Sequence, residues 1–154
     1  MKVLVSACLL GVPCRYDGQS KLFPAVAAQL KDHQLVPICP EQLGGLTTPR
    51  PACEIQDGRL RTREGEDKTA AFQMGAEEAL RLFHLLDCEA AILKARSPSC
   101  GKGQVYDGTF TGTLKEGNGI LAQRLLDEGI KVYTENEVLM PQEDDPWVSV
   151  AGQG

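Results

Sequence analysis

The sequence lacks most of the patterns that identify a cysteine-containing protein at sight. It has only two histidines, an aromatic content of 5%, and no C-x-x-C pair among its six cysteines. Without such a pair, a zinc ribbon, a thioredoxin-like redox pair and a ferredoxin-type cluster motif are all poorly supported. No apolar run approaches transmembrane length. The net charge of −5 argues against a general nucleic-acid-binding or acidic-membrane-binding protein, although a local basic pocket is compatible with it.

What is present fits one soluble globular domain. The chain has 154 residues, of which 42% are hydrophobic and 24% charged. The apolar stretch near the N-terminus is broken by Gly11 and Pro13, so we interpret it as a strand and loop rather than a signal peptide. These features predict a cytoplasmic protein, either a monomer or a small homo-oligomer. We expect one domain over residues 1–140, followed by a polar, proline-containing C-terminal tail over residues 141–154.

Hydrophobic periodicity predicts strands that alternate with helices along the chain. The Gly- and Pro-rich segment of residues 40–55 is predicted as loop, and a small hairpin is expected to turn at Asp57-Gly58 within residues 54–62. A second hairpin is expected within residues 103–114. The alternation is typical of an α/β fold with an open, mostly parallel, Rossmann-like sheet and flanking helices. The strands are expected at 2–7, 34–39, 89–95 and 130–135, and the helices at 23–33, 66–87 and 119–129.

Three of the cysteines follow predicted strands. Cys8, Cys39 and Cys100 come at or shortly after the ends of the first three strands, and ligands of open α/β sheets bind at those carboxyl ends. Disulfides are rare in the cytoplasm, so metal binding or catalysis is the expected use of these thiols. Three thiolates can bind three irons of a [4Fe-4S] cluster and leave one iron open, or bind zinc with one open position. The scarcity of histidine favours the all-sulfur cluster.

Polar residues with useful chemistry lie beside these cysteines. Glu41 follows Cys39 by two residues, where a carboxylate can act as general base for water near a bound metal. Ser97 and Ser99 flank Cys100 on its N-terminal side and can relay a proton or donate hydrogen bonds to cluster sulfurs. Arginine in these loops can pair with a phosphate. The candidate substrate-binding residues are Arg15, Arg50, Ser99, Gly44 and Gly45.

Taken together, six segments resemble the family of TudS-type thiouracil desulfidases. They are SACLLGVPCRYDG, PICPEQLGGLTTPR, GEDKTAAFQMGA, ILKARSPSCG, YDGTFTG and GILAQRLLDEGIKV, and they run in order from about residue 4 to about residue 138. The resemblance implies an oxygen-sensitive [4Fe-4S] cluster bound by Cys8, Cys39 and Cys100. It also implies that Glu41 and Ser97 form the acid/base pair. The chain departs from the family pattern at Cys53, which we therefore do not count among the ligands.

The implied reaction is a non-redox, hydrolytic desulfuration. Its substrate would be 4-thiouracil or 4-thio-UMP, with the substrate sulfur bound by the open iron, and its products uracil or UMP and hydrogen sulfide. The alternative is a non-catalytic iron–sulfur or zinc protein that acts as a sulfur carrier or redox sensor. The sequence leaves open free base against nucleotide, 2-thio against 4-thio, Cys14 against Cys8 as ligand, and Ser97 against Ser99 as relay. The acidic net charge makes intact nucleic acid a less expected substrate than a free base or nucleotide.

Overall fold

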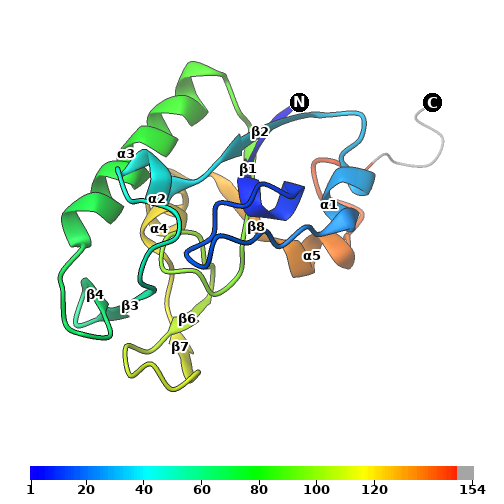
Figure 1. Ribbon diagram of the computed structural model, residues 1–154. Coiled ribbons are helices and arrows are strands. Elements are labelled where there is room, and N and C mark those ends of the chain that lie inside the picture. The colour runs from blue at the N-terminus through cyan, green and yellow to red at the C-terminus, as the bar shows by residue number, and fades with distance from the viewer. Residues whose placement is uncertain (149–154) are drawn as a thin grey trace.

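A four-stranded parallel sheet forms the centre of the computed structural model, which describes residues 1–148 (Figure 1). Its strand order is β2 (Gln34–Ile38), β1 (Lys2–Ser6), β5 (Ala90–Leu93) and β8 (Lys131–Thr134). The two inner strands are short and apolar and are buried almost throughout, as expected for a sheet that is covered on both faces. The predicted open parallel α/β sheet is confirmed.

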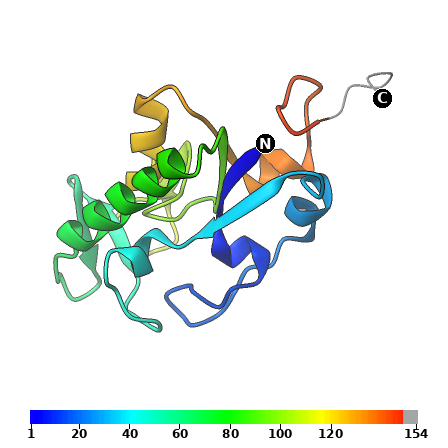
Figure 2. The ribbon, with the colours of Figure 1, turned by 90° about the horizontal axis from the view of Figure 1, so that it is seen from above.

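Helices cover both faces of this sheet (Figure 2). Leu4 packs on one side in a cluster with α3 (Thr69–Leu85) and α4 (Ile120–Asp127). Val3 and Val5 pack on the other side with α1 (Pro24–Gln29), α5 (Glu135–Leu139) and the 3-10 turn η1 (Ala7–Leu10). Successive side chains of a strand point to opposite faces, so these short strands supply apolar contacts to both helical layers.

Two antiparallel hairpins lie together beyond the carboxyl edge of the sheet (Figure 1). The first pairs β3 (Cys53–Gln56) with β4 (Arg59–Thr62), and the second pairs β6 (Gln104–Tyr106) with β7 (Leu114–Glu116). Asp57 and Gly58 have φ values of 51° and 74°, the conformation of the tight turn that an Asp-Gly pair favours. The first hairpin is therefore as predicted, and the second forms in the expected region.

Two short helices were missed by the sequence patterns. The predicted loop of residues 40–55 begins with a helical turn, α2 (Pro40–Leu43), which packs against α3. Gly44 and Gly75 allow this packing, because a Cβ on Gly44 would lie 2.0 Å from the backbone oxygen of Ala71. The other helix, α5, starts with a capping box between Thr134 and Glu137. Both helices begin directly at the carboxyl edge of the sheet.

Part of the expected C-terminal tail packs onto the domain. Trp147 is buried and meets Tyr133 edge-on with ring centroids 4.5 Å apart. Its backbone oxygen lies 3.4 Å from Nε2 of His33. The packed part of the chain thus extends past residue 140, while residues 149–154 of the expected tail lie outside the described residues. Within residues 1–148, no helix is both long and apolar enough to cross a membrane.

Candidate functional site

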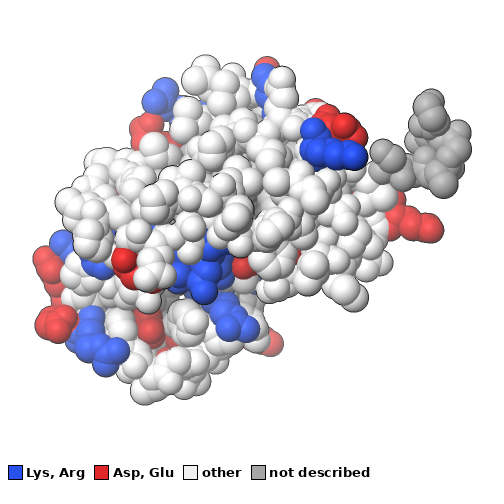
Figure 3. Space-filling model, turned by 45° about the vertical axis from the view of Figure 1, so that its right-hand side comes forward, with Lys and Arg blue, Asp and Glu red and all other residues white. Residues whose placement is uncertain are grey.

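A cavity of about 680 Å³ opens at the carboxyl edge of the parallel sheet. The chain leaves β1 toward β2 on one side and later returns to β5 on the other, so the strand order reverses between β1 and β5. Such a reversal point is where ligands bind in open α/β sheets. Side chains from the loops after β1, β2, β5 and β8 line the cavity, and the two hairpins close its far wall. Lysine and arginine side chains gather around a hollow in the surface (Figure 3).

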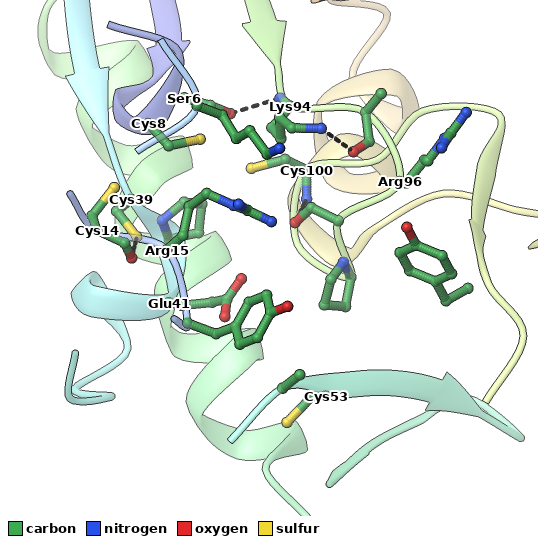
Figure 4. A pocket seen from close by; sticks show the side chains of 18 of the residues that line it. Ser6, Cys8, Cys14, Arg15, Cys39, Glu41, Cys53, Lys94, Arg96 and Cys100 are labelled. Carbon is green, nitrogen blue, oxygen red and sulfur yellow. Dashed lines mark hydrogen bonds between the residues drawn. The ribbon is translucent and has the colours of Figure 1, made fainter. Parts of the chain in front are cut away.

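The three predicted metal-ligating cysteines all line this cavity. Cys8 lies in η1 directly after β1, Cys39 follows β2 at the start of α2, and Cys100 is in the loop after β5. Figure 4 shows Cys8 and Cys100 pointing toward one another, with Cys39 on a second side next to Cys14. The Sγ atom of Cys39 lies 3.7 Å from the backbone oxygen of Cys14. The strand ends thus bring together thiols that are far apart in the sequence.

Burial and a contact between two thiols shift the pKa values of these cysteines. Burial raises the pKa of Cys8 to about 11, and it raises the pKa of the fully buried Cys100 as well. The pKa of Cys39 lies below its ordinary value, mainly because the thiol of Cys14 hydrogen-bonds to it, and the same contact raises the pKa of Cys14. A metal that bound here would displace protons from Cys8 and Cys100, since metals bind the thiolate form.

The donor set suits an all-sulfur cluster better than a single ion. A zinc ion needs its ligands within about 2.3 Å, which puts the ligand atoms in near contact with one another. Residues 1–148 contain no group of three or more His, Cys, Asp or Glu side chains gathered closely enough to hold one metal ion. The thiols instead approach the cavity from separate loops, as ligands of a larger group would.

Glu41 faces the same cavity, and Arg50 fixes its position. The Nε atom of Arg50 donates to Oε1 of Glu41 over 3.1 Å. Nη2 of Arg50 donates to the backbone oxygen of Cys14 over 2.9 Å, and Nη1 donates to Thr47 and Thr48. The Arg50 side chain is only 5% exposed, against 17% for Glu41. The guanidinium is therefore engaged on every nitrogen and joins α2 and its own loop to the Cys14 loop, which leaves little of it for the phosphate contact suggested by the sequence.

The two candidate serines occupy different positions. Ser99 is buried and does not line the cavity, and its hydroxyl donates to Oε2 of Glu41 over 3.2 Å. Ser97 lines the cavity, and its Oγ accepts the backbone N–H groups of Ser99 and Cys100, both over 3.1 Å. Ser99 thus orients the carboxylate, whereas Ser97 lines the cavity and its Oγ accepts from the backbone of the Cys100 loop.

The remaining candidate substrate-binding residues divide in the same way. Arg15 lines the cavity, and its Nη1 lies 3.5 Å from the carboxylate of Asp17. Neither Gly44 nor Gly45 lines it. Gly44 instead sits at the contact between α2 and α3, where there is no room for a side chain. Gly44 thus shapes the packing behind Glu41, whereas Gly45, with a φ of 89°, serves the turn that follows α2.

Several residues that line the cavity are not among the site residues predicted from the sequence. Lys94 and Glu135 line the cavity from the ends of β5 and β8, and their charged groups lie 3.1 Å apart. Only the position of each residue at the end of a predicted strand could have suggested them. In total, six basic residues and three glutamates line the cavity, although the chain as a whole is acidic. The basic residues are Arg15, Lys21, Arg50, Arg63, Lys94 and Arg96.

Comparisons with known proteins agree with this arrangement. The family model described as 2-thiouracil desulfurase matches residues 3–137. YbbK, an uncharacterized protein of Bacillus subtilis (strain 168), is 38% identical over an alignment that covers 88% of this chain and 97% of that protein. A solved structure of the [4Fe-4S]-dependent thiouracil desulfidase TudS is similar with a TM-score of 0.85 and 43% sequence identity. That match covers 90% of this chain and 93% of the other.

Proposed function

Because the chain belongs to the 2-thiouracil desulfurase family, we propose that it is an enzyme that removes sulfur from a thiolated uracil with the help of a bound [4Fe-4S] cluster. One observation supports this function above the others: three thiols from three strand ends and a carboxylate line a single cavity. A sulfur carrier or redox sensor would need the thiols but not a carboxylate held beside them.

Cys8, Cys39 and Cys100 would hold the cluster. They come from different loops that meet at one cavity, so together they would supply three ligands and would leave the fourth iron without a protein ligand. When bound, a cluster of this kind supplies a Lewis acid that accepts the thiocarbonyl sulfur and makes the adjoining ring carbon electrophilic. Cys14 is the alternative ligand, because it lines the cavity next to Cys39.

Glu41 is the proposed general base. Its carboxylate is fixed on one oxygen by Arg50 and on the other by Ser99, and it still faces the cavity. There it can take a proton from the water that attacks the ring carbon. Ser97 is the proposed relay that carries a proton to the departing sulfur. In the balanced reaction, water and the thiocarbonyl compound yield the carbonyl compound and hydrogen sulfide.

A small nucleotide is the proposed substrate, with 4-thio-UMP ahead of free 4-thiouracil. The excess of basic residues around the cavity favours an anionic ligand. Arg15 remains a candidate for the phosphate contact, whereas Arg50 is better assigned to holding Glu41. The phosphate of the nucleotide would bind among the basic side chains, so that its thiolated nucleobase could reach the cysteines.

Anaerobic purification followed by an assay with 4-thio-UMP tests this function. We expect a brown protein with about four irons per chain that converts 4-thio-UMP to UMP and sulfide. Cluster-loaded protein that leaves both 4-thio-UMP and 4-thiouracil unchanged would contradict the enzyme and favour a carrier or sensor.

A pair of cysteine variants tests the ligands separately. Cys100→Ser should lose bound iron, whereas Cys53→Ser, which changes another buried thiol of the same cavity, should retain it. The same iron determination on Cys8→Ser and Cys14→Ser decides between these two cysteines. Iron retained at the wild-type level in Cys100→Ser would refute the proposed ligand set.

A further inference from the structure

A second ion pair in the cavity takes no part in the mechanism described above. Nζ of Lys94 lies 3.1 Å from Oε2 of Glu135 and donates to the backbone oxygen of Ala95 over 3.1 Å. The other carboxylate oxygen of Glu135 accepts the N–H of Ala95 over 2.7 Å. Glu135 is therefore tied to the end of β5 at two points and has little freedom to turn.

The backbone next to Lys94 is tied to the neighbouring strand. The N–H of Lys94 donates to Oγ of Ser6 over 2.9 Å. Ser6 ends β1, Lys94 follows β5, and Glu135 follows β8, and these three strands are neighbours in the sheet. The three residues thus form a row along the carboxyl edge and line the cavity. Figure 4 shows Ser6 and Lys94 beside Cys8 and Cys100.

The pair presents its positive end to the cavity. The Glu135 side chain is 6% exposed and that of Lys94 is 22% exposed. Lys94 lines the same cavity as Cys8 and Cys100 and lies close to both (Figure 4). A cation thus stands at the end of the cavity where two of the proposed ligands meet.

The stability of the fold is a weak explanation for the Lys94–Glu135 ion pair. Moving two charges out of water is costly, and well-packed apolar residues of similar size often stabilise a fold as well or better. A largely buried carboxylate that holds a lysine beside thiols in a ligand-binding cavity is better explained by what the lysine does there.

We propose that Lys94 stabilises negative charge at the Cys8 and Cys100 end of the site, on the thiolate ligands and on the sulfur that leaves the substrate, and that Glu135 is its counter-ion, which offsets part of that positive charge. This inference rests on the proposed function. A cluster with three thiolates gathers negative charge, as does a departing hydrosulfide, and a fixed ammonium in a half-buried site stabilises both.

The reduction potential of the cluster in the anaerobically prepared holoprotein tests the proposal. Reduction adds negative charge, so Lys94→Met should lower the potential, whereas Lys94→Arg should leave it close to wild type. Glu135→Gln removes a negative charge and keeps an acceptor for the N–H of Ala95, so it should raise the potential. A structural defect would not move the two variants in opposite directions.

Inhibition by added sulfide supplies a second measurement. Lys94→Met should raise the inhibition constant of sulfide about tenfold, which corresponds to the loss of one ordinary charge interaction. Lys94→Arg should keep the constant close to that of the wild type. If Lys94→Met does not bind the cluster, Lys94→Arg and Glu135→Gln decide the question by the same potentials.

Two results would overturn the proposal. They are an unchanged potential in both Lys94→Met and Glu135→Gln, and a shift of the same sign in both. With cluster and desulfidase activity retained, either result refutes only the role of Lys94. A wild-type chain that binds no cluster would instead refute the proposed function, and this inference with it.

Discussion

Two ion pairs face the same cavity with opposite ends exposed. In Glu41–Arg50 the arginine is buried and the carboxylate meets the cavity, whereas in Lys94–Glu135 the glutamate is buried and the ammonium meets it. Both pairs have the same 3.1 Å separation. The pairs differ in which partner is held and buried by the surrounding backbone. The other partner then presents its charge to a ligand in the cavity.

The chemistry of the two cations explains this difference. A guanidinium has five N–H donors in a rigid plane, and Arg50 uses them to join Glu41 to the Cys14 and Thr47–Thr48 loops. An ammonium has three donors, and Lys94 gives two of them to Glu135 and Ala95, which leaves one toward the cavity. Arginine therefore serves as the anchor in one pair, while lysine is the anchored group in the other.

The largest effect is expected from removing the exposed carboxylate of the first pair. Glu41→Gln keeps an oxygen for Arg50 but loses the base, so the desulfidation rate should fall about 100- to 10,000-fold while the cluster is retained. Steady-state assays together with iron determination measure both quantities. Glu116→Gln, an exposed glutamate that does not line the cavity, is the control. Wild-type activity in Glu41→Gln would remove Glu41 from the mechanism.

Breaking the anchor of the first pair should mainly affect stability. Lysine cannot replace the contacts of the Arg50 guanidinium, so Arg50→Lys should lower the free energy of unfolding by about 3 kcal/mol. Urea denaturation measures the change. The control is Arg59→Lys, in an exposed pair with Asp67, which should cost less than about 1 kcal/mol. Equal losses in the two variants would show that Arg50 is no anchor.

The serines around Glu41 should separate by their positions. Ser97→Ala removes the hydroxyl that faces the cavity and should lower kcat about 100-fold, the lower end of the range for proton transfer. Ser99→Ala removes one hydrogen bond to Glu41 and should cost about fivefold. The reverse order, with the greater loss in Ser99→Ala, would make Ser99 the relay.

The smallest effect concerns the thiols on the two sides of the cavity. Thiolate is the reactive form, and burial raises the pKa of Cys8 and of Cys53 to about 11, whereas the pKa of Cys39 lies below its ordinary value. In iron-free protein at neutral pH, iodoacetamide should therefore modify Cys39 first. Cys8 and Cys53 should gain reactivity only as the pH rises toward 11. Peptide mass spectrometry gives the order, and denatured protein, in which the order should vanish, is the control.

Sequence patterns predicted the parts of this fold that depend on local chemistry. Short apolar runs predicted the strands, and Asp57-Gly58 predicted a hairpin turn, because each is encoded within a few residues. The gathering of Cys8, Cys39 and Cys100 followed from their places at the ends of strands, since parallel strands share one carboxyl edge.

The parts that escaped prediction depend on contacts between distant segments. Helix α2 depends on the close approach of Gly44 to the backbone of α3, and nothing local reveals that contact. The sequence suggested that Arg50 could bind a phosphate. In the structure, however, its guanidinium contacts Glu41 and the Cys14 and Thr47–Thr48 loops. In sequence, Glu135 is one more polar residue that follows a strand, as many exposed residues do. It is buried because its carboxylate contacts the backbone at the end of β5, which is distant in the sequence.

The most direct test of the proposed hydrolysis is to let cluster-loaded protein react with 4-thio-UMP in ¹⁸O-labelled water and to measure the mass of the product by mass spectrometry. If Glu41 activates water to replace the sulfur, each UMP carries one ¹⁸O atom and one equivalent of sulfide is released. Product without the label, or thionucleotide that remains unchanged, would contradict the account.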